Sequence, residues 1–409
     1  MRISTMTWLL ASVLLFGVLV MSRAEENQGS RAGTDQTALV KGNDSFATDL
    51  YARLSSQSGN LFFSPFSIST ALGMTYVGAR GQTADQMAST LHFTLDRERL
   101  LRAFNSLRQQ LNGGARSRKY QLHVANALWG QKDYGFREEY LRTTQAAFGA
   151  GLREVDFATS EQARQTINHW VEDQTQKKIT DLLPPGSVNA STRLVLTNAI
   201  YFKGAWSHPF SKKSTKQEDF EVTADKIVPV PMMHQTEELA YFDGANFQLL
   251  ELPYQSHELS MLVLLPKKAA EIAEFEKQIR AEQLNKWRAN LKTHQVTLSL
   301  PKFKFTAEFS LKGTLSGMGM PLAFSDKADL SGMCTHEKLF IDEVIHKAFV
   351  DVNEEGTEAA AATGVTVKAL ALRVVPRAFF RADHPFVFVI RDNQTGAILF
   401  MGRVSNPQA

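Results

Sequence analysis

Hydrophobic positions in the first part of the chain recur at helical spacing. The segment 43–54 places apolar residues on one face after a capping-type start, and 160–175 repeats this spacing. The segment 83–91 begins with Thr83 and, three residues later, Gln86, a pair typical of a helix N-terminal capping box. The first third of the chain is therefore predicted to be helical.

After about residue 193 the pattern changes to one that is typical of β-strands. Apolar residues form short runs or alternate with polar ones in 193–206, 247–254, 259–266 and 296–305. At the C-terminus, two apolar runs around the turn 392–396 predict a β-hairpin. Helices followed by strands favour an α+β fold with large, mostly antiparallel sheets.

The segment 353–373 fits neither pattern. Its first half has four consecutive alanines behind glutamates, which favours a helix, and its second half alternates β-branched and small residues like a strand. Gly356 and Gly364 flank the alanines. A flexible linker or a short helix is the simplest interpretation. A linker would separate domains, however, and only a short strand-forming segment follows, while a helix does not explain the two glycines.

Composition and charge describe an ordinary globular protein. The 409 residues are 44% hydrophobic and 21% charged, and no Pro/Ser-rich linker, charge block or repeat divides the interior. One large domain over 40–409 is therefore predicted. The formal net charge of +3 is too small to indicate a nucleic-acid partner.

The N-terminus has the features of a signal peptide. Arg2 precedes an apolar stretch over 8–20, and small residues lead to a cleavage site after Ala24. The alternative is a membrane anchor, but the apolar run is short for a spanning helix. We expect 1–24 to be removed, 25–39 to be disordered, and the protein to be secreted without a membrane association. In a bacterium the destination would be the periplasm or the cell surface.

The motifs of common enzyme classes are missing from the sequence. There is no nucleophile elbow, P-loop, H-E-x-x-H or C-x-x-C motif, and the histidines are scattered. We therefore predict no catalytic residue, no cofactor and no metal site. Cys334 is the single cysteine, so an internal disulfide is excluded and a buried structural thiol is the expected role.

A basic cluster is the one candidate for an additional ligand. It comprises Arg97, Arg99, Arg102, Arg108 and the stretch 116–119. Such a cluster is typical of a solvated surface, and polyanion binding is the sharper alternative.

Four long motifs resemble the serpin family of serine protease inhibitors. They are 60–83, 194–206, 354–364 and 384–403, in the serpin order and at serpin spacing, and the resemblance extends over the chain from about residue 40. It implies a serpin fold with three mostly antiparallel sheets, eight or nine helices and an exposed reactive-centre loop over about 354–380. It also implies that the protein is a monomeric protease inhibitor and not an enzyme.

The serpin mechanism accounts for the unusual segment. In that mechanism a protease cuts the loop, and the N-terminal part of the loop then inserts as a strand into the large sheet. With a strand period of two, Thr357, Ala359, Ala361 and Thr363 would face the interior, and all four are small and uncharged. New ladder hydrogen bonds of about 1 kcal/mol each would make the uncut form metastable.

The resemblance also assigns individual residues. Counted from Gly356 as in serpins, the reactive bond is Leu370–Ala371, which implies a chymotrypsin-like, elastase-like or cathepsin-G-like target. A shift by one residue would move the cut, and Arg373 is a minor, trypsin-like alternative. The hinge comprises Glu354, Glu355, Gly356, Thr357, Glu358, Ala359, Ala360, Ala361 and Ala362. Trp206 and Lys302 lie where insertion starts, with Lys302 as the partner of Glu354, and the polar cluster under the sheet is Ser64, Ser67, Asn198 and His346.

Two other functions stay open on the sequence alone. A non-inhibitory serpin would act as a binding or chaperone module, although such proteins tend to carry bulky, charged or proline residues in the hinge. An inhibitor of cysteine proteases could use the same loop, because insertion does not depend on the nucleophile of the protease.

Overall fold

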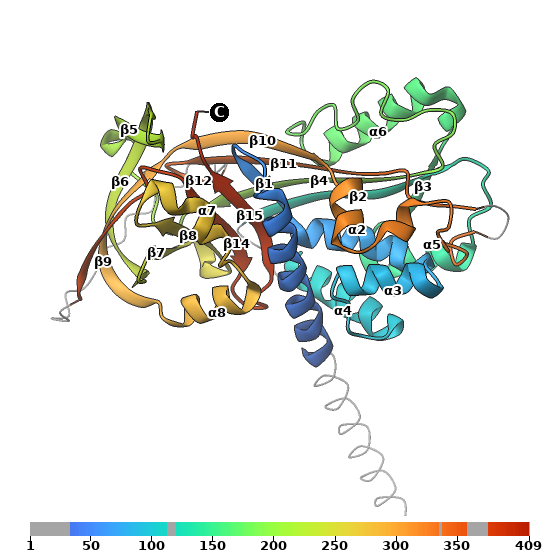
Figure 1. Cartoon of the computed structure of the whole chain (residues 1–409), viewed down its shortest axis with the longest axis horizontal. Coiled ribbons are helices and arrows are strands. Elements are labelled where there is room, and N and C mark those ends of the chain that lie inside the picture. Colours follow the sequence, from blue (N-terminus) through green and yellow to red (C-terminus); the bar gives the residue numbers. More distant parts are fainter. Residues whose placement is uncertain (1–32, 113–119, 335–337, 358–374, 409) are drawn as a thin grey trace, which may run out of the picture.

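The computed structural model describes residues 33–112, 120–334, 338–357 and 375–408, and its two sheets are packed against helices (Figure 1). The six-stranded sheet has the order β10-β11-β12-β4-β2-β3, and the nine-stranded sheet has the order β1-β15-β14-β8-β7-β6-β9-β13, with β5 paired to β6. Most strand pairs are antiparallel. The three sheets expected from the resemblance appear as two because the long strand β6 pairs with β7 at one end and with β5 and β9 along the rest.

The six-stranded sheet consists of β10 (Phe303–Ser310), β11 (Glu343–Asn353), β12 (Gly356–Thr357), β4 (Leu194–Ala205), β2 (Tyr120–Gln131) and β3 (Leu152–Val155). The nine-stranded sheet consists of β1 (Leu61–Phe63), β15 (Ile398–Val404), β14 (Phe386–Asp392), β8 (Leu259–Pro266), β7 (Phe247–Pro253), β6 (Lys226–Asp243), β9 (Lys292–Pro301), β13 (Arg377–Arg381) and β5 (Lys216–Thr223).

Nine α-helices occur in the described ranges. They are a helix over 33–54, α2 (Pro65–Gly78), α3 (Gly81–Thr90), α4 (Arg97–Leu111), α5 (Glu138–Phe148), α6 (Ser160–Gln174), α7 (Ile272–Glu276), α8 (Ala281–Ala289) and α9 (Lys312–Met318). In Figure 1, α6 covers one face of the six-stranded sheet and α2 to α5 lie on the other. None of the helices in the described part of the chain is long and apolar enough to cross a membrane.

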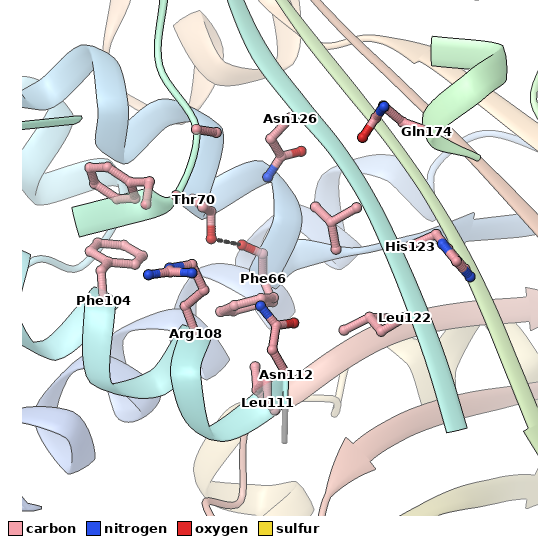
Figure 2. A pocket seen from close by; sticks show the side chains of 14 residues that line it. Phe66, Thr70, Phe104, Arg108, Leu111, Asn112, Leu122, His123, Asn126 and Gln174 are labelled. Carbon is pink, nitrogen blue, oxygen red and sulfur yellow. Dashed lines mark hydrogen bonds between the residues drawn. The ribbon is translucent and has the colours of Figure 1, made fainter. Parts of the chain in front are cut away.

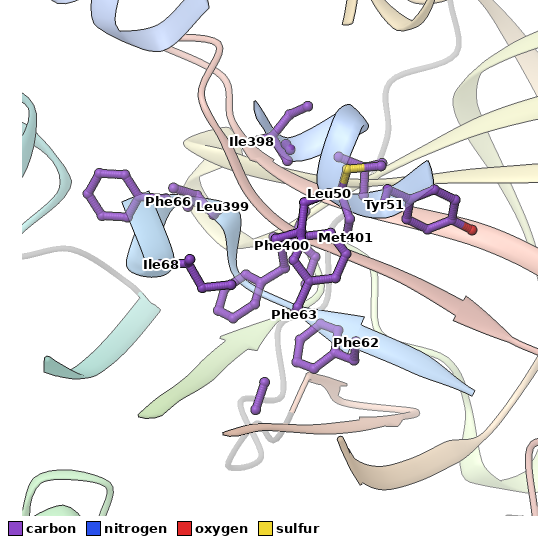
Figure 3. Close-up of a cluster of buried hydrophobic side chains, with 14 of the residues drawn as sticks. Leu50, Tyr51, Phe62, Phe63, Phe66, Ile68, Ile398, Leu399, Phe400 and Met401 are labelled. Carbon is purple, nitrogen blue, oxygen red and sulfur yellow. The ribbon is translucent and has the colours of Figure 1, made fainter. Parts of the chain in front are cut away.

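The core holds the two sheets and the first helices together. At its centre, side chains from the helix over 33–54, β1, the start of α2 and β15 meet (Figure 3). Phe62 of β1 stacks on Phe400 of β15 with ring centroids 5.1 Å apart. A second, smaller cluster lies between α6 and the six-stranded sheet. Both faces of that sheet are therefore buried, so any strand that enters it must present side chains that fit a packed interior on both sides.

Most of the predicted elements are confirmed. The four predicted strand segments correspond to β4, β7, β8 and the pair β9–β10, and the C-terminal hairpin is β14–β15. The predicted helix over 160–175 is α6. Strands β1 and β2, however, lie in the part of the chain predicted to be helical, so that prediction is wrong for Leu61–Phe63 and Tyr120–Gln131.

Two helix starts differ from the prediction. The first helix begins by residue 33, so the expected disorder over 25–39 is wrong for 33–39: Leu39 and Val40 are buried, and Asp35 pairs with Arg99. Arg99 is far from Asp35 in the sequence, so no local sequence pattern predicts this contact. Helix α3 begins at Gly81 without a side-chain cap.

Candidate functional site: a hinge strand within the sheet

The hinge begins inside the six-stranded sheet. Strands β4 and β11 pair directly and in parallel from Val195–Tyr201 against Glu343–Phe349. Beyond this stretch they diverge, and β12 lies between them, antiparallel to both. The two residues of β12 thus close the gap at one end of the sheet, immediately before the segment 358–374.

Glycine is the only residue type that fits at position 356. Its φ of 149° is one that side chains rarely adopt. An added Cβ would lie 2.1 Å from the carbonyl oxygen of Gly204 and 2.7 Å from the Cα of Ala205. The glycine therefore allows the chain to cross closely over β4 as it turns from β11 into β12.

Thr357 is fully inside the sheet. Its side chain is 1% exposed, and its hydroxyl lies 2.8 Å from the phenol oxygen of Tyr254. Burial raises the pKa of Tyr254, so the phenol stays protonated and available for this bond. The expectation that the loop is exposed from its beginning is therefore wrong for Thr357, because β4 and β11 leave room for one more strand at this end.

An ion pair fixes the chain just before β12. Glu354 is 4% exposed, and its Oε2 lies 2.8 Å from Nζ of Lys302, which follows β9. Its Oε1 accepts a hydrogen bond of 2.8 Å from the Thr215 hydroxyl. Burial alone would raise the pKa of Glu354, but the hydrogen bonds and charge of these partners lower it, so the carboxylate is ionised at neutral pH.

Trp206 packs against the hinge and binds its backbone. Its indole N–H donates to the carbonyl of Asn353 at 3.0 Å, and its backbone N–H donates to the carbonyl of Glu355 at 2.9 Å. The ring stacks on Tyr254 with centroids 4.6 Å apart. Glu355 also pairs with Lys212 at 2.8 Å. Every residue from 353 to 357 therefore has at least one contact that holds the hinge against the sheet.

A row of polar side chains crosses the middle of the same sheet. Asn126 of β2 is opposite Asn198 of β4, and Asn198 is opposite His346 of β11. Ser64 and Ser67, at the start of α2, lie beneath the row. The row lies where β4 and β11 pair directly. A strand that extended from β12 between β4 and β11 would therefore have to pass between members of the row.

Each member of the row is hydrogen-bonded. The Asn198 amide group donates to Ser67 Oγ at 2.8 Å and to Asn126 Oδ1 at 2.5 Å, and its oxygen bonds His346 Nδ1. The backbone N–H of Ser64 donates to His346 Nε2 at 3.1 Å, and the Ser64 hydroxyl donates to the carbonyl of Leu399. Nε2 is therefore the acceptor and Nδ1 carries the proton, so the imidazole is neutral. Burial lowers the pKa of His346 to about 3.

Comparison with known proteins assigns the chain to a family. A family model described as "Serpin (serine protease inhibitor)" matches residues 41–407. The chain belongs to the serpin family. The human leukocyte elastase inhibitor is 44% identical over 382 residues, which cover 90% of this chain and 99% of that protein.

Solved structures support the same assignment. Serpin48 of the insect Tenebrio molitor has a TM-score of 0.80 and 34% identity, and the match covers 90% of this chain and 98% of that one. Human thyroxine-binding globulin in complex with its hormone has a TM-score of 0.83 and 31% identity, with coverages of 91% and 99%. The fold is therefore that of the serpins.

The structure of this serpin brings most of the candidate residues together in two places. Glu354, Glu355, Gly356 and Thr357 lie with Trp206 and Lys302 at the hinge, and Ser64, Ser67, Asn198 and His346 lie in the polar row. The remaining hinge residues and the reactive bond lie outside the described residues: Glu358, Ala359, Ala360, Ala361, Ala362, Leu370 and Ala371.

Three residues of the site were not predicted from the sequence. Asn126 completes the polar row, Thr215 shares the carboxylate of Glu354, and Tyr254 binds Thr357. Only Asn126 left a signal, because it is a lone amide within the apolar stretch 124–129. Tyr254 and Thr215 reach the hinge through tertiary contacts alone.

A pocket borders the polar row on the side of α4 and α5 (Figure 2). Its volume is about 320 Å³, and its lining includes Phe66, Phe104, Leu122, Phe148 and Asn126. Unfilled volume behind a strand means fewer packing contacts to break when that strand moves. The pocket thus gives β2 room to shift if β4 and β11 separate.

The neutral state of His346 predicts a pH dependence of stability. A histidine pKa lowered in the folded state means that the unfolded chain binds the extra proton between about pH 6.5 and pH 3, so stability is lost as the pH falls through this range. From pH 7 to pH 5 the loss is about 2 kcal/mol. We expect the difference in free energy of unfolding between wild type and His346→Gln to shrink by this amount, as measured by urea denaturation.

The comparison must be made between variants because other groups also titrate. Burial raises the pKa of Asp44 to about 7, which contributes with the opposite sign. His169→Gln is the matched control, since its side chain is 77% exposed and any change in its pH profile gives the contribution of a surface histidine. A difference between wild type and His346→Gln that stays constant from pH 7 to pH 5 would show that His346 is not held neutral.

Proposed function

We propose that this serpin is an exported suicide-substrate inhibitor of serine endopeptidases with chymotrypsin-like or elastase-like specificity. The observation that carries the proposal is β12, a two-residue strand that already lies between β4 and β11 directly before the reactive loop. Because β12 is the beginning of an additional strand at one end of the sheet, the sheet is suited to accept the rest of that strand after cleavage.

The register of β12 supports complete insertion. Extended along β4, it would place Ala360 opposite Tyr201 and Thr366 opposite Val195; extended along β11, it would place the same two residues opposite Phe349 and Glu343. These are the two ends of the stretch where β4 and β11 now pair with each other. One register therefore satisfies both neighbouring strands, so the segment can replace their direct pairing without a bulge.

The same register brings a hydroxyl to the polar row. It would place Thr363 between Asn198 and His346, whose side chains now bond each other. Insertion would break that bond, and a buried polar group left without a partner is costly. A threonine at this position can both donate and accept, so it can restore the lost bond.

Trapping would follow from the distance that the cut end travels. Cleavage by a serine protease leaves the new C-terminal end of the loop as an acyl ester on the catalytic serine. Insertion would carry that end along the sheet by roughly 3.3 Å per residue. A protease pulled against the body of the inhibitor would lose the alignment of its oxyanion hole, and the ester would not be hydrolysed.

Two features support the specificity and the export. Leu370 at the expected cut suits an apolar primary pocket, and the human relative at 44% identity is named a leukocyte elastase inhibitor. The sequence 1–24 has signal-peptide features and precedes the family match, which begins at residue 41. The same fold also carries a thyroxine-binding globulin, so the inhibitory function needs a direct test.

The test is incubation with four proteases followed by a denaturing gel. With chymotrypsin or pancreatic elastase we expect a band that is stable to denaturant and has the summed mass of both proteins less the segment 371–409, which cleavage at Leu370–Ala371 releases. Trypsin serves as the specificity control, and papain tests the inhibition of cysteine proteases. Clean cleavage by all four enzymes without a covalent complex would contradict inhibition and favour a binding role.

A further inference from the structure

Three arginines line a hollow away from the hinge. Its volume is about 440 Å³, and it lies where the end of α2, the starts of α3, α4 and α5 and the segment 329–333 meet. Arg80, Arg97 and Arg137 line it from three different elements, together with the apolar side chains of Val77, Leu101 and Tyr140. The three positive charges are therefore gathered by the fold and not by proximity in sequence.

The described hydrogen bonds of these arginines go to backbone carbonyls, and Arg97 also lies over the Tyr76 ring at 5.3 Å from its centroid. Arg80 Nη1 donates to the carbonyls of Val77 and Ala79 at 3.0 and 2.8 Å, and Arg97 Nη2 donates to that of Ala79 at 2.8 Å. Arg137 Nε donates to the carbonyl of Ser331 at 3.0 Å. Among the described residues, none of the three has a carboxylate within ion-pair distance. The bonds fix the guanidinium groups without cancelling their charge.

The charges act on one another. Burial lowers the pKa of Arg80, and the neighbouring Arg97 and Arg137 lower it further, while Asp329 and Glu139 act in the opposite direction. Gly332 allows this proximity, since an added Cβ would lie 2.5 Å from Nη2 of Arg80. Like charges held together in a concave site favour an anion that joins them.

The remaining surroundings leave room for an anion. Helices α3 and α5 begin directly after Arg80 and Arg137 and have no side-chain caps, so the positive ends of both helix dipoles lie nearby. Two carboxylates line the hollow. Glu98 already pairs with Arg102, and Glu139 is exposed. A third carboxylate, Asp329, acts on Arg80 from outside the lining and is hydrogen-bonded to Ser331, so among the described residues no carboxylate is paired with any of the three arginines.

We propose that this hollow binds a compact, multiply charged phosphate-type anion, with Arg80, Arg97 and Arg137 as its ligands. A concave site of this size suits a small ligand, and guanidinium groups bind phosphate oxygens in pairs of parallel hydrogen bonds. A long sulfated chain fits the observations less well, because on the exposed face of α4 Arg99 pairs with Asp35 and Arg102 pairs with Glu98.

The test is calorimetric titration of the full chain with pyrophosphate in low-salt buffer. We expect saturable binding at one site and a melting temperature that rises with ligand concentration. Arg97→Gln and Arg137→Gln should each weaken binding by about tenfold, since each removes charge-assisted hydrogen bonds. Glu139→Gln should tighten it by about threefold because it removes a repelling charge.

The matched control is Arg142→Gln on α5, which makes the same change of charge at an exposed site outside the hollow. Its affinity should equal that of wild type. Arg137 is also exposed, so the loss in its variant would not reflect unfolding. Absence of saturable binding, or equal affinity in wild type, Arg137→Gln and Arg142→Gln, overturns the proposal.

Two further titrations identify the source of the anion. Glucose 6-phosphate tests whether an esterified phosphate is accepted in place of the inorganic form. Once pyrophosphate has been shown to bind, binding of glucose 6-phosphate would indicate that a phosphate ester is accepted, and no binding would restrict the site to inorganic phosphates. A sulfated disaccharide should bind more weakly than pyrophosphate. Tighter binding of the disaccharide that is lost in Arg99→Gln or Arg102→Gln would place a sulfated sugar on α4 and overturn the phosphate assignment.

Discussion

Thr357→Arg is expected to convert the protein from an inhibitor of its target protease into a substrate. Thr357 lies between β4 and β11 with 1% of its surface exposed, so an arginine there would displace β12 from the sheet, and insertion would then have to bury an unpaired charge. Leaving such a charge buried costs about 3 to 5 kcal/mol. The loop would then insert more slowly than the acyl-enzyme is hydrolysed. The yield of covalent complex on a denaturing gel should fall about a hundredfold.

The variant should still fold. Strands β4 and β11 pair directly through seven aligned positions below β12, and this pairing does not depend on Thr357. Two controls separate the charge from other effects. Thr306→Arg makes the same substitution at an exposed position of β10 in the same sheet, and Thr357→Val removes only the bond to Tyr254. If Thr357→Arg forms complexes as efficiently as Thr306→Arg, β12 has no part in insertion.

Cleavage of the loop at Leu370–Ala371 should raise the melting temperature. Full insertion would replace one parallel ladder between β4 and β11 by two antiparallel ladders with the new strand, a gain of about ten hydrogen bonds. At about 1 kcal/mol each, the gain is comparable to the whole stability of an ordinary domain. For a chain of this size we expect an increase of about 10 to 20 °C, measured by calorimetry before and after limited proteolysis.

The site of the cut decides the interpretation of this experiment. Mass spectrometry must place it between Gly364 and Phe379, because a cut elsewhere tests another loop. Cleaved Thr357→Arg is the control and should show little or no increase, since its strand cannot enter the sheet. An ordinary nicked loop leaves stability unchanged or lower. The same result for the wild type would indicate a non-inhibitory serpin with an intact fold.

Local patterns in the sequence predict much of this fold because both sheets are buried and their strands are strongly apolar. The runs 259–266 and 386–392 became β8 and β14 for that reason. Strand β2 has the same length as β4, but it carries Gln121, His123 and Asn126 among its apolar residues, and this mixed pattern concealed it. The polar residues are present because β2 forms part of the polar row and borders a pocket.

The predicted capping box shows how tertiary contacts can override a local motif. Thr83 and Gln86 have the right spacing, but α3 starts two residues earlier. The Thr83 hydroxyl instead accepts from the backbone of Asp329, and the Gln86 carbonyl accepts from that of Leu322. Both side chains cap distant segments of the chain. In the same way, the burial of Thr357 follows from the spacing of β4 and β11, which no local pattern records.

The stacked indole of Trp206 gives the hinge an intrinsic optical signal. It is buried, lies against Tyr254 and donates its N–H to the backbone just before β12. Fluorescence of an indole depends on the polarity around it and on that hydrogen bond, so movement of the hinge would change its emission. The sequence has five tryptophans, and replacing the other four by phenylalanine would leave this one as a label-free reporter. Stopped-flow spectroscopy could then time the entry of the loop against the cutting of the peptide bond.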